Sequence, residues 1–105
     1  MAVQISIYLN EADHWERQPL HIALLEYLRK ENVAGATVVH AVAGFTGRRG
    51  VVSASLVDVG ARLPMLLTFI DTDEHVQRVL PRLKEMAPHR LIVREEVKIE
   101  QGCFE

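Results

Sequence analysis

Two adjacent arginines, Arg48 and Arg49, lie between Gly47 and Gly50 and are the side chains best suited to hold a ligand. Guanidinium groups match the oxygens of phosphate or carboxylate through paired hydrogen bonds, and flanking glycines let the backbone approach such an anion closely. The alternative is an exposed turn with two solvated charges. The pattern is equally compatible with an anion-binding turn and with a solvated turn, and it leaves any ligand open.

The other reactive side chains show no spacing typical of catalysis or of metal binding. The five histidines lack the His-Glu-x-x-His pattern, and the single cysteine, Cys103, lies in the C-terminal tail. Ser53 and Ser55 have no Gly-x-Ser-x-Gly context, so nucleophilic catalysis is not expected. We therefore predict a protein that is not an enzyme and holds no metal, although His14 and His40 leave open a metal site assembled across an oligomer.

The composition of the chain argues against several classes of partner. Its 105 residues carry a net charge of −2, which does not favour nucleic acid or an anionic membrane surface. No apolar run approaches the roughly 18 residues that a transmembrane helix needs. Gln4 and Ser6 interrupt the N-terminal apolar residues, unlike in a signal peptide. We expect one cytoplasmic domain over residues 1–105, with no nucleic acid partner and no membrane insertion.

Hydrophobic periodicity predicts the elements that must position these residues. Residues 3–9 alternate strictly between apolar and polar side chains, as in a half-buried strand, whereas helical spacing follows Pro19. The run after Pro64 is almost continuously apolar, as in a strand covered on both faces. The expected elements are strand 3–9, helix 19–32, strand 37–42, strand 65–70, helix 72–87 and strand 91–99.

Local signals set the expected ends of these elements. Gly35 is placed to end the first helical region and turn the chain. Asp71 or Thr72 is expected to cap the second helix, and Pro81 to kink it or divide it. In the last strand Glu95 falls on an otherwise apolar face and is an irregularity.

The order of the elements is that of two strand-helix-strand units. It predicts an α+β fold, a ferredoxin-like βαββαβ sandwich with one antiparallel four-stranded sheet and two helices on one face. The other face of such a sheet would be bare, and an oligomer is the economical way to cover it. The long segment at about 44–63 is expected to be a functional loop.

Short motifs follow one another through the chain in a recognisable order. The first set is Gly35-Ala36-Thr37-Val38, Gly44-Phe45, Gly50 and Leu63-Pro64. The second set adds Trp15 with Pro19-Leu20, Ala34, Ala43 and the apolar strand that ends at Asp71. By the first set the sequence resembles the PII signalling proteins. By both sets together it is identified as a member of the PII-like family known as domain of unknown function 190, over nearly its full length.

This resemblance implies a homotrimer with three clefts between subunits and three mobile loops. In PII proteins the clefts hold adenine nucleotides and the loops engage a target protein, commonly a membrane transporter or an enzyme. Carried over by position, Gly35 and Thr37 would lie near the adenine, and the root of the loop would lie beside the phosphates. The predicted ligand-binding residues are Gly35, Thr37, Gly44, Phe45, Gly47, Arg48, Arg49, His89 and Arg90.

The sequence also departs from the PII pattern. PII proteins carry a Gly- and Lys-rich phosphate loop after the second helix, and here the stretch is Ala87-Pro88-His89-Arg90, which argues against triphosphate binding. Three alternatives to a nucleotide-binding regulator follow. They are a divalent-cation-binding trimer of the same fold, a protein-interaction module without a ligand, and an RNA-binding module, which the negative charge disfavours.

Overall fold

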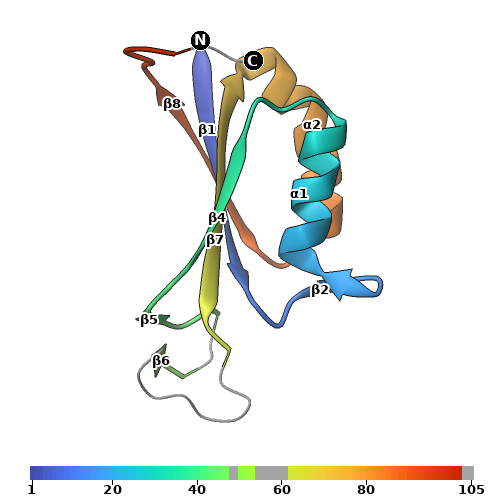
Figure 1. Ribbon diagram of the computed structural model, residues 1–105, viewed down its shortest axis with the longest axis vertical. Helices are drawn as coiled ribbons and strands as arrows, with labels where there is room; N and C mark the ends of the chain where they lie inside the picture. The colour runs from blue at the N-terminus through green and yellow to red at the C-terminus, as the bar shows by residue number, and fades with distance from the viewer. Residues whose placement is uncertain (48–49, 54–61, 103–105) are drawn as a thin grey trace.

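The main sheet has four antiparallel strands in the order β4-β7-β1-β8, and both helices pack on one of its faces (Figure 1). The computed structural model describes residues 1–47, 50–53 and 62–102. The predicted α+β fold, a ferredoxin-like βαββαβ sandwich, is confirmed. The strands are β1 Ala2–Asn10, β4 Ala36–His40, β7 Pro64–Thr72 and β8 Leu91–Val97, and the helices are α1 Leu20–Lys30 and α2 Asp73–Met86.

Two short hairpins that the periodicity did not predict lie at one end of the sheet (Figure 1). In the first, β2 (His14–Trp15) pairs with β3 (Gln18–Pro19) just before α1. In the second, β5 (Ala43–Gly44) pairs with β6 (Val52–Ser53) at the start of the long loop. The strand expected over residues 37–42 ends earlier than expected, because β4 covers residues 36–40 and the chain then leaves the main sheet for the separate hairpin that begins at residue 43.

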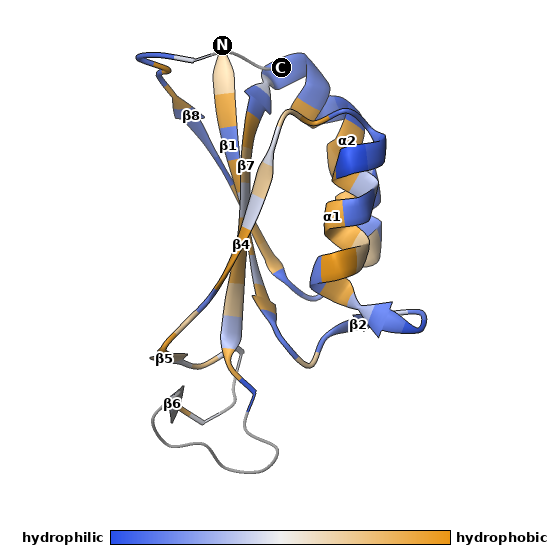
Figure 2. Cartoon of the chain, in the orientation of Figure 1, coloured by the Kyte–Doolittle hydropathy of each residue, from blue (hydrophilic) through white to orange (hydrophobic). Residues whose placement is uncertain are grey.

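The core lies between the sheet and the helices and is built from alternate residues of the two central strands. β1 and β7 pair so that Ile5 lies opposite Phe69 and Ile7 opposite Leu67, and all four side chains are at most 3% exposed. The apolar sides of the helices fill the same space (Figure 2). Complete burial of each such side chain contributes about 1.5–3 kcal/mol. The helix residues at most 1% exposed are Leu24, Leu28, Val76, Val79 and Leu83.

The sheet face opposite the helices, which we call the open face, is covered by no helix of the described chain (Figure 1). It carries several exposed apolar side chains. Leu91 pairs with Tyr8 and Val93 with Ser6, so both lie on the open face, whereas Ile92 pairs with Ile7 and packs against the core. Glu95 lies on the same face, as the sequence pattern predicted, and its charged side chain is exposed there and not in the core. The exposed apolar residues of the open face are Tyr8 at 46%, Val39 at 51%, Ile70 at 37%, Leu91 at 63% and Val93 at 37%.

The start of α2 settles which of two candidate residues caps the helix. The Thr72 hydroxyl accepts a hydrogen bond from the His75 backbone N–H at 3.2 Å, which is the contact of an N-cap. Asp71 is buried and its Oδ2 lies 2.9 Å from Nδ1 of the His75 ring. Nε2 of the same ring lies 2.7 Å from the carbonyl oxygen of Glu31, which ties α2 to the end of α1. Pro81 does not divide α2, because the helix is continuous from residue 73 to residue 86.

The turn after α1 does not depend on Gly35. The residue with a left-handed backbone is Asn32, whose φ is 63°, whereas Gly35 has no positive φ. Asparagine tolerates this conformation because its short polar side chain can bond locally. Gly35 therefore lies beyond the turn that ends the helix.

Replacement of the α2 cap tests this assignment. Thr72→Ala should lower the free energy of unfolding by about 1 kcal/mol, because one N–H at the start of α2 loses its acceptor. Thr72→Ser keeps the hydroxyl and should restore most of the loss. Urea unfolding followed by circular dichroism measures both variants, and equal destabilisation by the two substitutions would contradict the cap.

Candidate functional site

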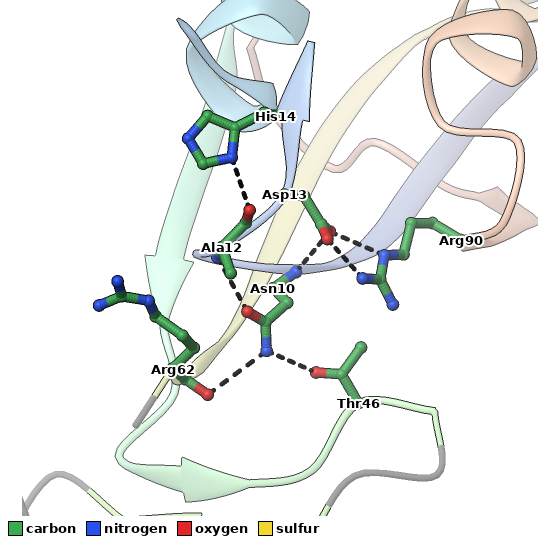
Figure 3. Close-up of polar contacts among 7 residues, drawn as sticks. All are labelled: Asn10, Ala12, Asp13, His14, Thr46, Arg62 and Arg90. Atoms are coloured by element: carbon green, nitrogen blue, oxygen red, sulfur yellow. Dashed lines mark hydrogen bonds and ion pairs between the residues drawn. The ribbon is translucent and has the colours of Figure 1, made fainter. Parts of the chain in front are cut away.

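The C-terminal end of β1 lies between the two ends of the long loop (Figure 3). The chain passes through β5 into the loop and returns at Leu63 into β7, which pairs with β1. We call residues 44–47 and 62–64, together with Asn10 and Glu11, the loop neck. The polar contacts described next join the neck to itself, to the end of β4, to the start of α1 and to the segment after α2.

Asn10 is the central residue of the loop neck. Its side-chain Nδ2 donates to Oγ1 of Thr46 at 3.4 Å and to the backbone carbonyl of Arg62 at 3.3 Å, so one amide group touches both ends of the loop. Its Oδ1 accepts from the Ala12 N–H at 2.8 Å. The residue is 3% exposed, and these bonds satisfy both donors and the acceptor of a buried amide.

Glu11 forms a second clasp across the neck. Its Oε1 accepts from the Leu63 N–H at 2.9 Å, and its backbone N–H donates to the Leu63 carbonyl at 3.1 Å. Its Oε2 lies 2.9 Å from Nε2 of His40, at the end of β4. The bond from the Leu63 amide, aided by His40 and the charge of Arg62, holds the pKa of the Glu11 carboxyl below its usual value.

Asp13 connects this region to the segment after α2. Its Oδ2 accepts from the backbone N–H of Asn10 at 2.9 Å and from Nε of Arg90 at 2.7 Å. Nη2 of Arg90 donates to the other carboxylate oxygen, which makes the pair bidentate. The Asp13 and Arg90 side chains are 13% and 19% exposed. The Asp13 carbonyl also accepts from the Leu20 N–H at 2.8 Å, at the start of α1.

A pocket of about 330 Å³ lies beside the Asp13–Arg90 pair, between the β2–β3 hairpin and the end of α2. Its lining is mostly apolar and includes the charged pair, so it can hold a small ligand whose anionic end faces Arg90. The Trp15 ring on its wall is covered by the Arg82 guanidinium, 5.2 Å from the ring centre. The lining includes Asp13, Trp15, Leu20, Met86, His89 and Arg90.

The structure gathers part of the predicted ligand set around the neck and this pocket. Gly44 lies against β7 with a φ of 155°, and a Cβ there would be only 3.1 Å from Cγ of Pro64, so the position requires glycine. Phe45 is 62% exposed and Gly47 has a left-handed φ of 63°. His89 is exposed at the rim of the pocket.

Four further predicted residues are placed differently or fall outside the description. Gly35 and Thr37 lie at the far end of β4 (Figure 1), where Gly35 borders a second hollow of about 310 Å³ near Arg29. Thr37 pairs with Thr68 and Asn10 with Pro64, so the two groups lie four residues apart along β7, about 13 Å. A ligand that contacts both groups in one chain must span about that distance. Arg48 and Arg49 lie outside the described residues, as does Cys103.

The residues that sequence reasoning missed are Asn10, Glu11 and Asp13. They belong to a polar run after an alternating strand, and such a run is typical of an ordinary loop. The available signal was the local pattern of Asn and Asp three residues apart, which is typical of side chains that bond nearby backbone. Nothing in the sequence indicated that Asn10 would be buried.

Among residues 1–47, 50–53 and 62–102, no group of three His, Cys, Asp or Glu side chains is arranged to hold a metal ion. His14 bonds the Ala12 carbonyl at 2.7 Å and His40 bonds Glu11, so each of these two histidines has a local partner. None of the helices in that part of the chain has the length and apolar character needed to span a bilayer.

The sequence matches a family of related proteins. A sequence model of the DUF190 family, described as uncharacterized ACR, matches residues 2–99. A UPF0166 protein of Methanocaldococcus jannaschii is 30% identical over 99 residues, which are 93% of this chain and 91% of that protein.

Solved structures show the same fold. CPII of Thiomonas intermedia K12, a nitrogen regulatory PII-like protein bound to ADP, AMP and bicarbonate, matches with a TM-score of 0.67 and 16% identity, over 95% of this chain and 89% of that one. The divalent ion tolerance protein CutA1 of Ehrlichia chaffeensis matches with a TM-score of 0.62 and 8% identity, over 95% and 84%. At these identities the likeness concerns the fold alone.

Acid should weaken the Glu11 clasp. Because the pKa of Glu11 is lowered in the folded protein, its carboxylate stabilises the fold above the usual glutamate pKa, and this contribution is lost as the pH falls through the lowered value. Glu11→Gln should therefore cost about 1 kcal/mol at neutral pH and little in acid. Urea unfolding near pH 7 and pH 3.5 measures this. Glu26→Gln, on the exposed side of α1, is the control, and a pH-independent cost of Glu11→Gln would contradict the clasp.

The Asp13–Arg90 pair should be strongly coupled. Arg90→Ala should cost about 2 kcal/mol, because the Asp13 carboxylate loses two charge-assisted bonds where it is largely shielded from water. A double-mutant cycle on the two residues should give about 1–2 kcal/mol of coupling. The exposed Arg82–Glu85 pair on α2 is the matched control and should give about 0.3–0.5 kcal/mol. Equal couplings for the two pairs would contradict a special role for Asp13.

Proposed function

The chain belongs to the DUF190 family, and we propose that it acts in the cytoplasm as a PII-like regulatory homotrimer. In this proposal, clefts between the subunits bind a small anionic effector, with an adenine nucleotide as the first candidate. The loop at residues 44–63 then acts on a partner protein, for which a membrane transporter is one candidate. The proposed activity is binding, without catalysis.

The observation that carries the proposal is the open face. Tyr8, Val39 and Leu91 are exposed on this one face of the sheet, whereas the opposite face of β1 and β7 is packed against the helices. Large apolar areas of this kind mark surfaces that bind another protein. A second copy of the chain is the simplest partner, because every copy offers the same surface.

The placement of the predicted ligand residues supports clefts between subunits. Gly35 and Thr37 lie at one end of β4, and the neck and Arg90 lie beyond its other end. A cleft between subunits would bring the two groups together from different copies of the chain, so one small ligand would contact both without spanning the length of β4.

The base of the loop supports a protein partner. Val42, Phe45 and Val51 are 80%, 62% and 74% exposed, and they flank the short β5–β6 hairpin. Exposed apolar side chains on a loop that a rigid sheet holds are typical of a binding surface. The neighbouring basic pair Arg48-Arg49 adds charge for an effector or for an acidic partner.

Native mass spectrometry tests the assembly and the ligand together. We expect a trimer that takes up to three ligand molecules from a panel of ADP, AMP, ATP and cyclic dinucleotides. Arg48→Ala and Arg49→Ala should each weaken binding about 10-fold or more, since a lost charge-assisted bond is worth about 1.5 kcal/mol or more. Arg78→Ala, an exposed arginine on α2, is the charge-matched control.

Other outcomes would change the proposal in defined ways. A monomer would remove the clefts and contradict the proposed function. A trimer that binds none of the nucleotides but takes up copper or zinc would favour the cation-binding alternative. A trimer that binds neither would leave a protein-interaction module.

A further inference from the structure

We propose that Asp13 and Asn10 form a latch through which an anion bound at Arg90 controls the geometry of the loop neck. This inference rests on the proposed function, because it concerns how binding of the effector would change the base of the loop. It assigns roles to two residues that the family resemblance does not single out. Both act as positioning residues, since neither needs to touch the effector.

The first part of the latch is a carboxylate that serves two partners. Oδ2 of Asp13 accepts from Nε of Arg90 at 2.7 Å and from the Asn10 N–H at 2.9 Å. A single oxygen therefore joins the segment after α2 to the end of β1. If Arg90 turns away, Asp13 loses the cation that fixes its position, and the Asn10 amide loses a fixed acceptor.

The second part is the side chain of Asn10, which continues from that amide to the loop. Its Nδ2 reaches Thr46 at the start of the loop and the Arg62 carbonyl at its end (Figure 3). At 3.4 and 3.3 Å these two bonds are longer than typical hydrogen bonds, so a small shift of Asn10 breaks them. The position of Asn10 therefore sets whether both ends of the loop are held together.

Glu11 makes the response local to the neck. It holds Leu63 through two bonds and His40 through a third, independently of Asp13. Release of the latch would free Thr46 and Arg62 while β7 stays paired with β1. The expected change is therefore a loosening of the neck without unfolding of the sheet.

The chemistry of Arg90 defines which ligands can open the latch. Its guanidinium is held by two parallel bonds to a carboxylate, and phosphate or a second carboxylate offers the same pair of oxygens. The pocket beside Arg90, which Leu20 and Met86 help to line, has room for the part of such a molecule next to its anionic group. The remainder would extend into the proposed cleft between subunits.

Hydrogen exchange measured by mass spectrometry or NMR tests the latch in the full-length protein. Asp13→Asn keeps the shape of the side chain and removes its charge. The amides of Asn10 and Ala12 should exchange at least 10-fold faster in this variant, while the amides of Ile5 and Phe69 in the sheet keep their rates. Asp73→Asn is the matched control, because Asp73 also pairs with an arginine, Arg94, but contacts none of the neck residues.

The same measurement on the wild-type protein, with and without saturating ADP, tests the control by an anion. The latch predicts that ADP speeds exchange at Asn10 and Ala12 while the sheet amides keep their rates. If ADP binds in native mass spectrometry but leaves these rates unchanged, the latch is wrong and the proposed function stands. If ADP does not bind, the nucleotide proposal fails, and the Asp13→Asn comparison alone decides whether the Asp13–Asn10 connection exists. Uniformly faster exchange in Asp13→Asn would show a general structural role and would also overturn the latch.

Discussion

The pairing of β1 with both β7 and β8 is the interaction on which the rest of this structure depends. β1 pairs with β7 over nine residues and lies between β7 and β8 in the sheet. Its inner side chains form the floor of the core, so its register cannot slip without exposing them. Because the strand is fixed along its length, its last residue, Asn10, occupies one defined position. The polar organisation of the neck follows from that position.

A buried polar network at the end of a strand is costly unless every group has a partner. Among the described residues no buried side-chain nitrogen or oxygen lacks a hydrogen bond. At the neck this is achieved by short local bonds from Asn10 and Asp13 and by the clasp of Glu11 on Leu63. The network therefore stabilises one arrangement of three chain segments that are distant in the sequence. The charge of Asp13 is balanced by Arg90, and the carboxylate of Glu11 bonds the His40 ring.

The fold was predictable because periodicity depends on which face of each element is buried. Residues 3–9 alternate strictly, and the helices carry clear apolar sides, so the layers and their order follow from the sequence. The apolar face of the last strand was identified but not assigned to a side of the sheet, since alternation cannot distinguish a core from a second apolar surface. The neck could not be predicted, because the burial of Asn10 depends on segments 36 and 52 residues away. Arg90 was expected to bind a ligand, and its bond to Asp13 came only from the structure.

The atoms that the loop contributes to its own neck are almost all backbone atoms. Among the contacts of the described neck residues 44–47 and 62–64, the Arg62 carbonyl and the Leu63 amide and carbonyl take part whatever side chains these positions carry, and Thr46 contributes its side-chain hydroxyl. These bonds therefore do not depend on the length or composition of the loop segment between Thr46 and Arg62. The scaffold can exchange one loop for another without redesign of the sheet, so new partners can be acquired in evolution, or grafted in the laboratory, as interchangeable inserts.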